Sequence, residues 1–282
     1  MTLSELNRHI IETLTPQLGQ SEARATARLL LEDDLGVTQS ALVLNPDRVL
    51  EPETPARFDR YLSRIISGEP PQYVMGTARW MGMDIAVTPD TLIPRPETAE
   101  LVDLITDDYS AADLRIADLC TGSGCIAVAL ARALPFAHVD AVDISDGAIA
   151  IARKNAALAP AGAVNVLKAN ILQDIPGTDS YDIIVSNPPY VLEGEMAGME
   201  PRVIDHEPHI ALFVPDDDPL RFYRAIADKA RNRLKAGGTL YFEINPLEVD
   251  NLKQMMSGYG FDTEFIRDAQ GKQRFIKARI KQ

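Results

Sequence analysis

Cysteine is scarce in this sequence. Its 282 residues include two cysteines, Cys120 and Cys125, which stand too close together to staple a domain. No second pair of Cys or His residues follows nearby, so neither a disulfide framework nor a zinc site is indicated. We therefore expect no metal centre, and we interpret both cysteines as small reduced residues packed in a tight turn.

Basic residues are also in deficit. The chain has 28 Lys and Arg residues against 41 Asp and Glu residues, which gives a formal net charge of -13 and a pI near 4.8. Such a charge repels the phosphates of nucleic acids, whose binding normally depends on Lys and Arg contacts. We expect no direct binding of nucleic acid, and a basic protein is the partner that this charge favours.

Long hydrophobic runs are missing as well. No segment approaches the ~18 apolar residues that a membrane span requires. The first ten residues contain acidic and polar side chains where a signal peptide needs a basic start and an apolar run. We therefore expect a cytoplasmic protein without membrane contacts. The length and the 46% of hydrophobic residues are typical of a folded catalytic unit with a small appendage.

The N-terminal part of the chain predicts short helices. Thr2 and Glu5 have the spacing of a capping box and precede apolar residues with helical period. A second helix is predicted from Ser21, with Gly36 as its stop. A third is predicted over residues 54–66, before a Gly-Glu-Pro-Pro sequence ends it.

The pattern then changes twice. Loose alternation around Gly82 predicts a β-hairpin, and the remaining sequence alternates strands with helices. We divide the chain into a helical domain (1–75), a hairpin linker (76–94) and an α/β domain (95–282). The α/β domain is predicted to be a mainly parallel, doubly wound, Rossmann-like sheet. Its strands are predicted at 114–119, 139–142, 164–167, 181–186 and 239–244, and its helices at 126–133, 147–157 and 221–234.

A glycine-rich turn follows the first strand of the α/β domain. It comprises Cys120, Thr121, Gly122, Ser123 and Gly124, and it opens a helix. Glycines there let a nucleotide-like ligand approach the backbone, and Asp143, about twenty residues further on, suits a ribose. This pair of features fits S-adenosylmethionine (SAM) or a dinucleotide, and Ala127 meets a dinucleotide site's need for a third small residue. The turn alone leaves both ligands open.

The sequence Asn187-Pro188-Pro189-Tyr190 favours SAM. It follows directly after a strand, at the sheet edge where open α/β folds bind ligands. The prolines stiffen the chain, so that the Asn187 Oδ1 atom and the Pro188 carbonyl are free to accept the two N–H groups of a planar amine. Such acceptors orient the nitrogen towards a methyl donor and stabilise the positive charge that develops on it. The Tyr190 ring is suited to stacking on the planar group.

On these motifs the chain resembles the HemK/PrmC family, the release factor glutamine methyltransferases. The resemblance covers nearly the whole sequence and includes the segments 68–76, 91–98 and 207–212, of which Ile-Pro-Arg-Pro-Glu-Thr is the most discriminating. It implies a substrate-docking N-terminal domain and a methyltransferase domain of about seven strands that ends in an antiparallel hairpin. The implied reaction transfers a methyl group from SAM to the glutamine side-chain nitrogen (N5) in the Gly-Gly-Gln motif of class I peptide chain release factors.

The resemblance also implies roles for single residues. Cys120 to Gly124 would line the methionine end of SAM, Asp143 would hold the ribose and Ile171 would contact the adenine. Asn187, Pro188, Pro189 and Tyr190 would bind the substrate glutamine, with Asn187, Pro188 and Tyr190 as the catalytic residues and Asn187 also touching the cofactor. Asn170 stands where many members have an acidic residue, and its amide oxygen would accept a hydrogen bond from the adenine.

Several alternatives stay open at this point. The two cysteines of the turn are similar to a sister family that methylates a glutamine of a ribosomal protein, whereas Arg95-Pro96-Glu97-Thr98 favours the release-factor branch. The tetrad Asn187-Pro188-Pro189-Tyr190 also suits the N6 amine of adenine in a nucleic acid. The acidic net charge of the chain disfavours binding of such a substrate. A third interpretation is a SAM-binding module without activity. Arg95 and Glu97 are expected either to form an ion pair that fixes the linker or to shape the cofactor pocket.

Overall fold

The computed structural model describes residues 1–110, 113–176 and 180–281. The chain divides into two compact units. The smaller unit comprises Met1–Arg79 and Glu200–His206, and the larger comprises Trp80–Met199 and Glu207–Gln282. The boundary thus falls inside the predicted hairpin, and a short segment from late in the chain groups with the N-terminal helices.

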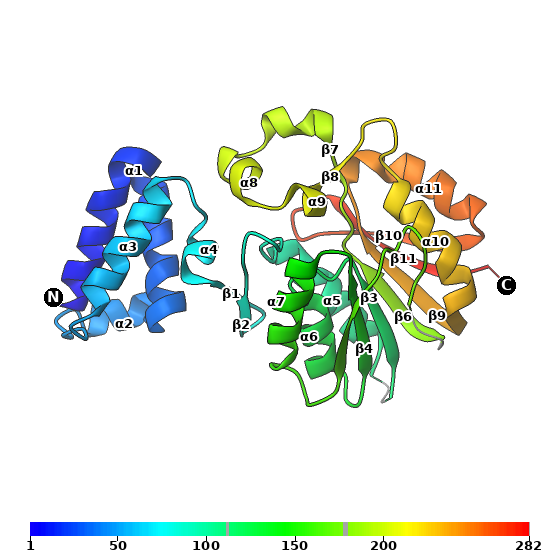
Figure 1. Ribbon diagram of the computed structural model, residues 1–282, viewed down its shortest axis with the longest axis horizontal. Coiled ribbons are helices and arrows are strands. Elements are labelled where there is room, and N and C mark those ends of the chain that lie inside the picture. The colour runs from blue at the N-terminus through cyan, green and yellow to red at the C-terminus, as the bar shows by residue number, and fades with distance from the viewer. Residues whose placement is uncertain (111–112, 177–179, 282) are drawn as a thin grey trace. The chain divides into compact units, whose positions relative to one another are not determined.

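The smaller unit is helical (Figure 1). Thr2 and Glu5 form the predicted capping box, with the Thr2 backbone N–H donating to Glu5 Oε2 over 2.7 Å. The first two predicted helices follow each other directly as the two parts of α1, separated by a kink at Gly19, whose φ of 77° is not helical. The second part ends at Gly36. The helices of this unit are α1 (Leu3–Leu35), α2 (Gln39–Leu44), α3 (Thr54–Ile66), α4 (Pro71–Met75) and α8 (Pro201–His206).

The core of the smaller unit has the helical period of its sequence. Side chains from α1 and α3 pack together, and the fully buried ones include Leu6, Ile10, Leu14, Leu30 and Phe58. The predicted apolar face of the first helix is therefore confirmed, and burying it stabilises a unit with its own core.

The predicted hairpin is present as β1 (Thr77–Trp80) and β2 (Met83–Ala86). Met81 and Gly82 connect the strands with φ values of 47° and 71°, the positive values that a tight hairpin turn requires. The Trp80 side chain is buried, and its Nε1–H donates to the Arg95 carbonyl over 2.9 Å. This contact ties the hairpin to the start of the α/β fold.

The larger unit is built on a seven-stranded sheet with the order β10-β11-β9-β6-β3-β4-β5. Parallel pairing joins β9, β6, β3, β4 and β5, while β11 pairs antiparallel with both β9 and β10. The strands are β3 (Arg115–Leu119), β4 (His138–Asp143), β5 (Val164–Lys168), β6 (Tyr181–Ser186), β9 (Leu234–Glu243), β10 (Phe261–Arg267) and β11 (Gln273–Ile280). The expected doubly wound α/β fold with a final antiparallel hairpin is confirmed.

Helices cover both faces of this sheet (Figure 1). On one side lie α5 (Pro96–Asp108), α6 (Cys125–Ala133) and α7 (Asp146–Ala156); on the other lie α10 (Arg221–Arg233) and α11 (Val249–Gly258). Four short elements of the larger unit lie between β6 and α10: β7 (Val191–Leu192), η1 (Glu193–Gly198), α9 (His209–Leu212) and β8 (Phe213–Val214). A further short helix, η2 (Pro246–Glu248), directly precedes α11. The sheet is thus a buried middle layer, as its apolar strands predict.

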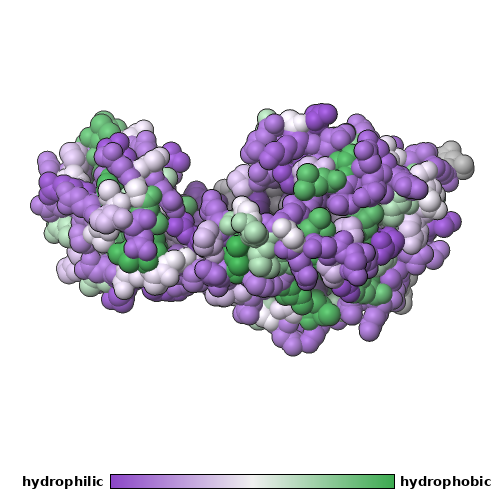
Figure 2. Space-filling view, turned by 90° about the horizontal axis from the view of Figure 1, so that it is seen from above, coloured by the Kyte–Doolittle hydropathy of each residue, from purple (hydrophilic) through white to green (hydrophobic). Residues whose placement is uncertain are grey.

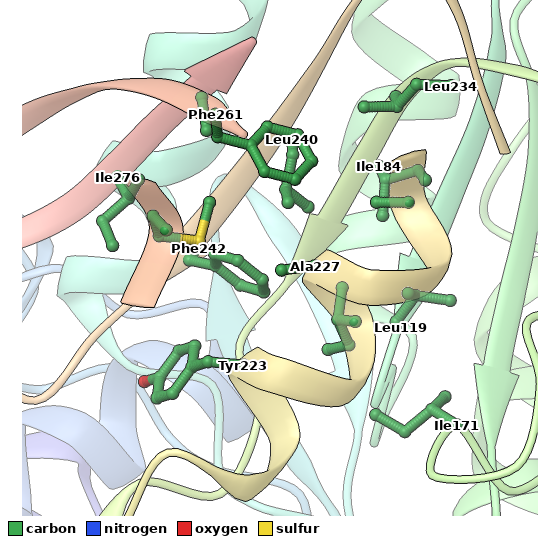
Figure 3. Close-up of a cluster of buried hydrophobic side chains, with 14 of the residues drawn as sticks. Leu119, Ile171, Ile184, Tyr223, Ala227, Leu234, Leu240, Phe242, Phe261 and Ile276 are labelled. Atoms are coloured by element: carbon green, nitrogen blue, oxygen red, sulfur yellow. The ribbon is translucent and has the colours of Figure 1, made fainter. Parts of the chain in front are cut away.

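The core between the sheet and α10 is shown in Figure 3. Tyr223 and Ala227 of α10 pack against Leu119, Leu240 and Phe242 of the strands, and all five side chains are buried. The Tyr223 and Phe242 rings meet edge to face at 5.1 Å. This packing fixes the carboxyl ends of β3 and β9 relative to each other, which is where the site lies.

Strand order creates a switch point between β3 and β6. The chain moves outward from β3 through β4 to β5, then returns to the other side of β3 as β6. Crevices at such points, outside the carboxyl ends of the strands, are the usual ligand sites of open α/β sheets.

Hydrophilic residues cover most of the face shown in Figure 2, and hydrophobic ones appear there as separate patches. Over the residues that the structure describes, no helix combines the length and the apolar character that crossing a membrane needs.

Candidate functional site

A cavity of about 330 Å³ lies at the switch point of the larger unit. Its size falls in the ~300–1,000 Å³ range of small-molecule sites. Residues from the turn after β3, the ends of β4 and β6, and the segment before α5 line it together. Eight residues predicted from the sequence are among them: Cys120, Thr121, Gly122, Ser123, Asp143, Ile171, Asn187 and Pro189.

Three residues of the turn after β3 have positive φ values, which two of them adopt readily because they are glycines. Cys120, Gly122 and Gly124 have φ values of 59°, 54° and 79°. A Cβ atom on Gly124 would lie 3.3 Å from the backbone and side chain of Ala152 in α7. Glycine suits position 124, because both its positive φ and the close approach of Ala152 disfavour a side chain there. Gly124 itself does not line the cavity.

Asp118, near the end of β3, stabilises this turn through hydrogen bonds. Its Oδ2 atom accepts hydrogen bonds from the Thr121 hydroxyl and, over 3.1 Å, from the Ala127 backbone N–H. The side chain is fully buried, and its Oδ1 atom accepts no hydrogen bond from the described part of the chain. Burial, with a contribution from the negative charge of Asp143, raises the pKa of Asp118 to about 7.

Asp143 ends β4 and faces the same turn. Its Oδ2 accepts the Gly122 N–H over 2.9 Å, and its Oδ1 accepts the Ser145 N–H over 3.0 Å. Each carboxylate oxygen has further acceptor capacity. Asp143 therefore braces the turn and still has lone pairs for the hydroxyl groups of a ligand.

A buried asparagine joins the turn to the hairpin. Asn155 of α7 donates from Nδ2 to the carbonyls of Ser123 (2.8 Å) and Ala86 (2.9 Å), and its Oδ1 accepts the Ala86 N–H over 2.8 Å. The side chain mimics a neighbouring strand for Ala86 while it fixes the Ser123 carbonyl. Sequence reasoning missed this residue, because its partners lie 32 and 69 positions away.

The tetrad follows β6 directly and so lies beside the turn after β3. The Asn187 Nδ2 atom donates to Thr98 Oγ1 over 3.3 Å, and the Thr98 hydroxyl donates to Glu243 Oε2 over 2.7 Å. Tyr190 donates its hydroxyl to the other oxygen of Glu243 over 3.0 Å. One buried carboxylate at the end of β9 thus contacts both ends of the tetrad, directly or through Thr98.

The ion pair expected to fix the linker joins Arg95 to Glu207, and among the described residues none joins Arg95 to Glu97. Arg95 lines the cavity and pairs with Glu207 over 2.6 Å, and the Glu207 carboxylate also accepts the Ile93 N–H over 3.2 Å. Glu97 accepts a long hydrogen bond of 3.4 Å from Gln270 Nε2. Arg95 therefore both fixes the segment that begins at Glu207 and contributes to the cavity wall.

Comparisons with known proteins give the family. A family model described as "Methyltransferase small domain" matches residues 98–205, and one described as "PrmC N-terminal domain" matches residues 5–76. A release factor glutamine methyltransferase of Bacteroides thetaiotaomicron is 43% identical over 281 residues, which cover 98% of this chain and 99% of the relative. The chain belongs to the release factor glutamine methyltransferase family.

Further relatives agree. The release factor glutamine methyltransferase of Flavobacterium psychrophilum is 37% identical over 286 residues, with 100% of both chains covered. The crystal structure of the ribosomal protein L11 methylase from Lactobacillus delbrueckii subsp. bulgaricus has a TM-score of 0.51 at 22% identity, covering 70% of this chain and 86% of that one. This likeness concerns the fold. The predicted class of enzyme, a methyltransferase with SAM as its cofactor, is confirmed.

Three residues predicted for the site do not line the cavity: Gly124, Pro188 and Tyr190. Tyr190 is partly buried against the core cluster, and burial, reinforced by the charge of Glu243, raises the pKa of its phenol well above the usual range. The cavity also contains residues that sequence reasoning did not assign to it, among them Asp90, Leu92, Ile210, Phe213 and Phe222. The family-like segments 91–98 and 207–212 were the signal for some of them.

Asn170 and Ile171 lie together at the cavity wall, where the family resemblance places the adenine. Ile171 is buried. The Asn170 Oδ1 atom accepts the Leu172 N–H over 3.0 Å, which orders the turn and leaves one lone pair of this oxygen for a ligand.

Both cysteines are free thiols. Burial raises the pKa of each, that of Cys125 to about 12 and that of Cys120 further still. They stay protonated at neutral pH and are unsuited to act as nucleophiles, which agrees with their interpretation as packing residues.

Proposed function

We propose that this chain transfers a methyl group from SAM to the N5 atom of the glutamine in the Gly-Gly-Gln motif of class I peptide chain release factors. The names of the relatives that match nearly its full length support the substrate. The observation that carries the chemistry is the position of the tetrad: Asn187 follows β6 and lines the same cavity as the glycine-rich turn and Asp143. A methyl donor and a planar amide would meet there.

The residues of the cavity fit SAM. Cys120 to Ser123 would hold its methionine end, because the positive φ values of Cys120 and Gly122 bring backbone groups close to a ligand. Asp143 would accept the ribose hydroxyls with the lone pairs that Gly122 and Ser145 leave unused. The buried Ile171 would contact the adenine. When bound, SAM supplies a methyl group on a positively charged sulfur.

The tetrad would orient the glutamine. Asn187 donates its Nδ2 group to Thr98, which leaves Oδ1 to accept one N–H of the substrate amide. The carbonyl of Pro188, whose two neighbours Asn187 and Pro189 both line the cavity, would accept the other. Two fixed acceptors align the nitrogen with the methyl group and stabilise the positive charge that it gains as the C–N bond forms and the C–S bond breaks. One proton then leaves the nitrogen. No strong base is required, because the charged nitrogen is acidic.

We assign docking of the release factor to the helical residues 1–75 and to the charge of the chain. The match of a PrmC N-terminal domain model to residues 5–76 supports this division. A formal net charge of -13 favours a basic protein surface. The KM for the release factor should therefore rise with ionic strength more steeply than the Kd for SAM, since exposed charges are screened by salt.

The proposal is tested with radiolabelled SAM and three acceptors side by side: a class I release factor, ribosomal proteins, and DNA or RNA. We expect label in the release factor, and none with the Asn187→Ala variant, which should still bind SAM. Label in a ribosomal protein or in nucleic acid, with the release factor unlabelled, would reject the substrate. Binding of SAM by the wild type without any transfer would indicate a silent binding module.

A further inference from the structure

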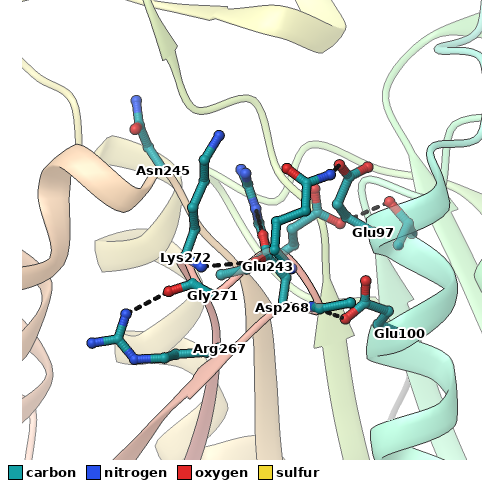
Figure 4. A network of polar contacts seen from close by, with 12 residues as sticks. Glu97, Glu100, Glu243, Asn245, Arg267, Asp268, Gly271 and Lys272 are labelled. Carbon is teal, nitrogen blue, oxygen red and sulfur yellow. Dashed lines mark hydrogen bonds and ion pairs between the residues drawn. The ribbon is translucent and has the colours of Figure 1, made fainter.

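The tetrad is held by a carboxylate that the reaction itself does not use. Glu243 ends β9, and its side chain is almost completely buried (1% exposed for the residue). Both oxygens are occupied, Oε2 by the Thr98 hydroxyl at 2.7 Å and Oε1 by the Tyr190 hydroxyl at 3.0 Å. Figure 4 shows Glu243 within a polar network that includes Glu97 of α5 and the turn between β10 and β11. Burying an acidic side chain in an apolar strand costs free energy, which suggests that Glu243 has a functional role.

The direction of these hydrogen bonds follows from the chemistry of the groups. An ionised carboxylate only accepts, and a hydroxyl has a single proton to donate. Thr98 gives that proton to Glu243, so the Thr98 oxygen can only accept from Asn187. It does so at 3.3 Å from Nδ2. A flipped Asn187 would place two acceptors against each other.

We infer that Glu243 is a positioning residue for the methyl transfer: through Thr98 it turns the Asn187 amide so that Oδ1 remains for the substrate. This inference rests on the proposed function, in which Asn187 Oδ1 accepts an N–H of the glutamine. The same carboxylate fixes the Tyr190 hydroxyl, so one residue of β9 sets the hydrogen bonding of both ends of the tetrad.

Burial raises the pKa of Glu243, and the charge of Glu97 adds to this rise; the hydrogen bonds from Thr98 and Tyr190 and the charge of Arg274 oppose it. Arg274 is itself held in place, since its Nε donates to the buried Asp268 over 3.2 Å. The β10–β11 hairpin therefore contributes a positive charge that acts on Glu243. We call the hydrogen-bonded chain from Glu243 through Thr98 to Asn187 the relay.

A neighbouring residue secures the backbone of the tetrad. The Asn245 Nδ2 atom donates to the Tyr190 carbonyl over 3.1 Å and to Glu195 Oε2 over 2.8 Å. Glu195 in turn accepts the Leu192 N–H over 2.9 Å. The chain after β9 thus holds Tyr190 at its carbonyl while Glu243 holds it at its hydroxyl.

Reversing the relay tests the inference. In N187D the new carboxylate faces the Thr98 oxygen, whose proton is committed to Glu243, so two acceptors meet. In N187D/E243Q the new amide at position 243 donates to Thr98, and Thr98 can donate to position 187. An oxygen at position 187 is then again free for the substrate. The two changes should compensate each other, although each alone is harmful.

The readouts are kcat for methylation of the release factor and the thermal midpoint of unfolding without substrate. We expect N187D to lose about 10²-fold or more in kcat and E243Q about tenfold, because acceptor placement governs the transfer. The double variant should exceed N187D at least about tenfold in kcat and unfold at a higher temperature. A double variant no more stable than N187D would contradict the relay. One that regains stability without activity would contradict the positioning role.

Thr98 provides a matched pair of controls. Thr98→Ser keeps the hydroxyl and should stay within about threefold of wild-type kcat, whereas the isosteric Thr98→Val should lose about tenfold. Because Thr98 lines the cavity, the Kd for SAM is measured for both variants and should be the same in the two. Equal kcat values for the two would overturn the inference. A wild type that leaves the release factor unmethylated would refute the proposed function instead, and the unfolding midpoints would still decide the relay.

Discussion

The backbone N–H of Gly122 donates to Asp143 Oδ2 over 2.9 Å, so the residue that ends β4 closes the turn that follows β3. Asp143 also accepts the Ser145 N–H over 3.0 Å. A single carboxylate thereby orders both loops at one edge of the sheet. We expect Asp143 to contribute to cofactor binding both through this ordering of the loops and through its remaining lone pairs.

Asp143→Asn should weaken SAM binding by about 10- to 100-fold, measured by isothermal titration calorimetry. The new NH₂ group must face either Gly122 N–H or Ser145 N–H, which sets a donor against a donor and removes a charge-assisted hydrogen bond. Asp146→Asn is the matched control. Asp146 is exposed and pairs with Lys168 on the surface, so its Kd for SAM should stay within about twofold of wild type. Equal affinity of Asp143→Asn and wild type would refute the assignment.

Arg95→Met should lower the free energy of unfolding by about 1–3 kcal/mol, because it leaves a buried carboxylate without its countercharge. The Glu207 side chain is 2% exposed and that of Arg95 is 33% exposed, so solvent screening reduces the loss from the value of a fully buried pair. Adding Glu207→Gln should recover part of the stability, since an amide oxygen still accepts the Ile93 N–H.

Urea denaturation checks this prediction. Lys253→Met serves as the comparison, because Lys253 pairs with Asp250 on the surface and should change stability by less than about 0.5 kcal/mol. Arg95→Met as stable as Lys253→Met would show that the Arg95–Glu207 pair does not stabilise the fold, which would leave Arg95 as a residue of the cavity wall.

Asp118 should make the stability of the ligand-free enzyme depend on pH. Its pKa is raised from 3.8 to about 7, so the folded state retains a proton that the unfolded state releases. This contribution is fully present below about pH 4 and is lost as the pH rises through about 7, to a total of roughly 4 kcal/mol. Asp118→Asn cannot ionise and should lack it. Denaturation of both proteins between pH 4 and 8 measures the difference, and parallel curves would contradict the prediction.

Local patterns in the sequence were sufficient for most of the fold. The capping box of Thr2 and Glu5 forms as predicted, and β6 has the predicted bounds of 181–186. Differences occur where tertiary pairing extends an element. The strand predicted at 239–244 begins at Leu234, because Leu234 pairs with Tyr181 ahead of an irregularity in the register.

The candidate site could be predicted only in part, because its contacts depend on strand order. Thr98 and Glu243 are 145 positions apart and Arg95 and Glu207 are 112 apart, and no local pattern links them. Glu243 did carry a signal of its own, as a charged residue between Phe242 and Ile244 in an apolar strand. Because β9 pairs with β6, Glu243 at the end of β9 lies beside the tetrad that follows β6. This pairing cannot be read from the local sequence.

Mass spectrometry of a class I release factor after incubation with the enzyme and SAM locates the transferred methyl group. We expect one added methyl group on the side-chain nitrogen of the glutamine in the Gly-Gly-Gln motif, absent when Asn187→Ala replaces the wild type. A methyl group on any other residue, or on the same glutamine with Asn187→Ala at the wild-type rate, would contradict this expectation.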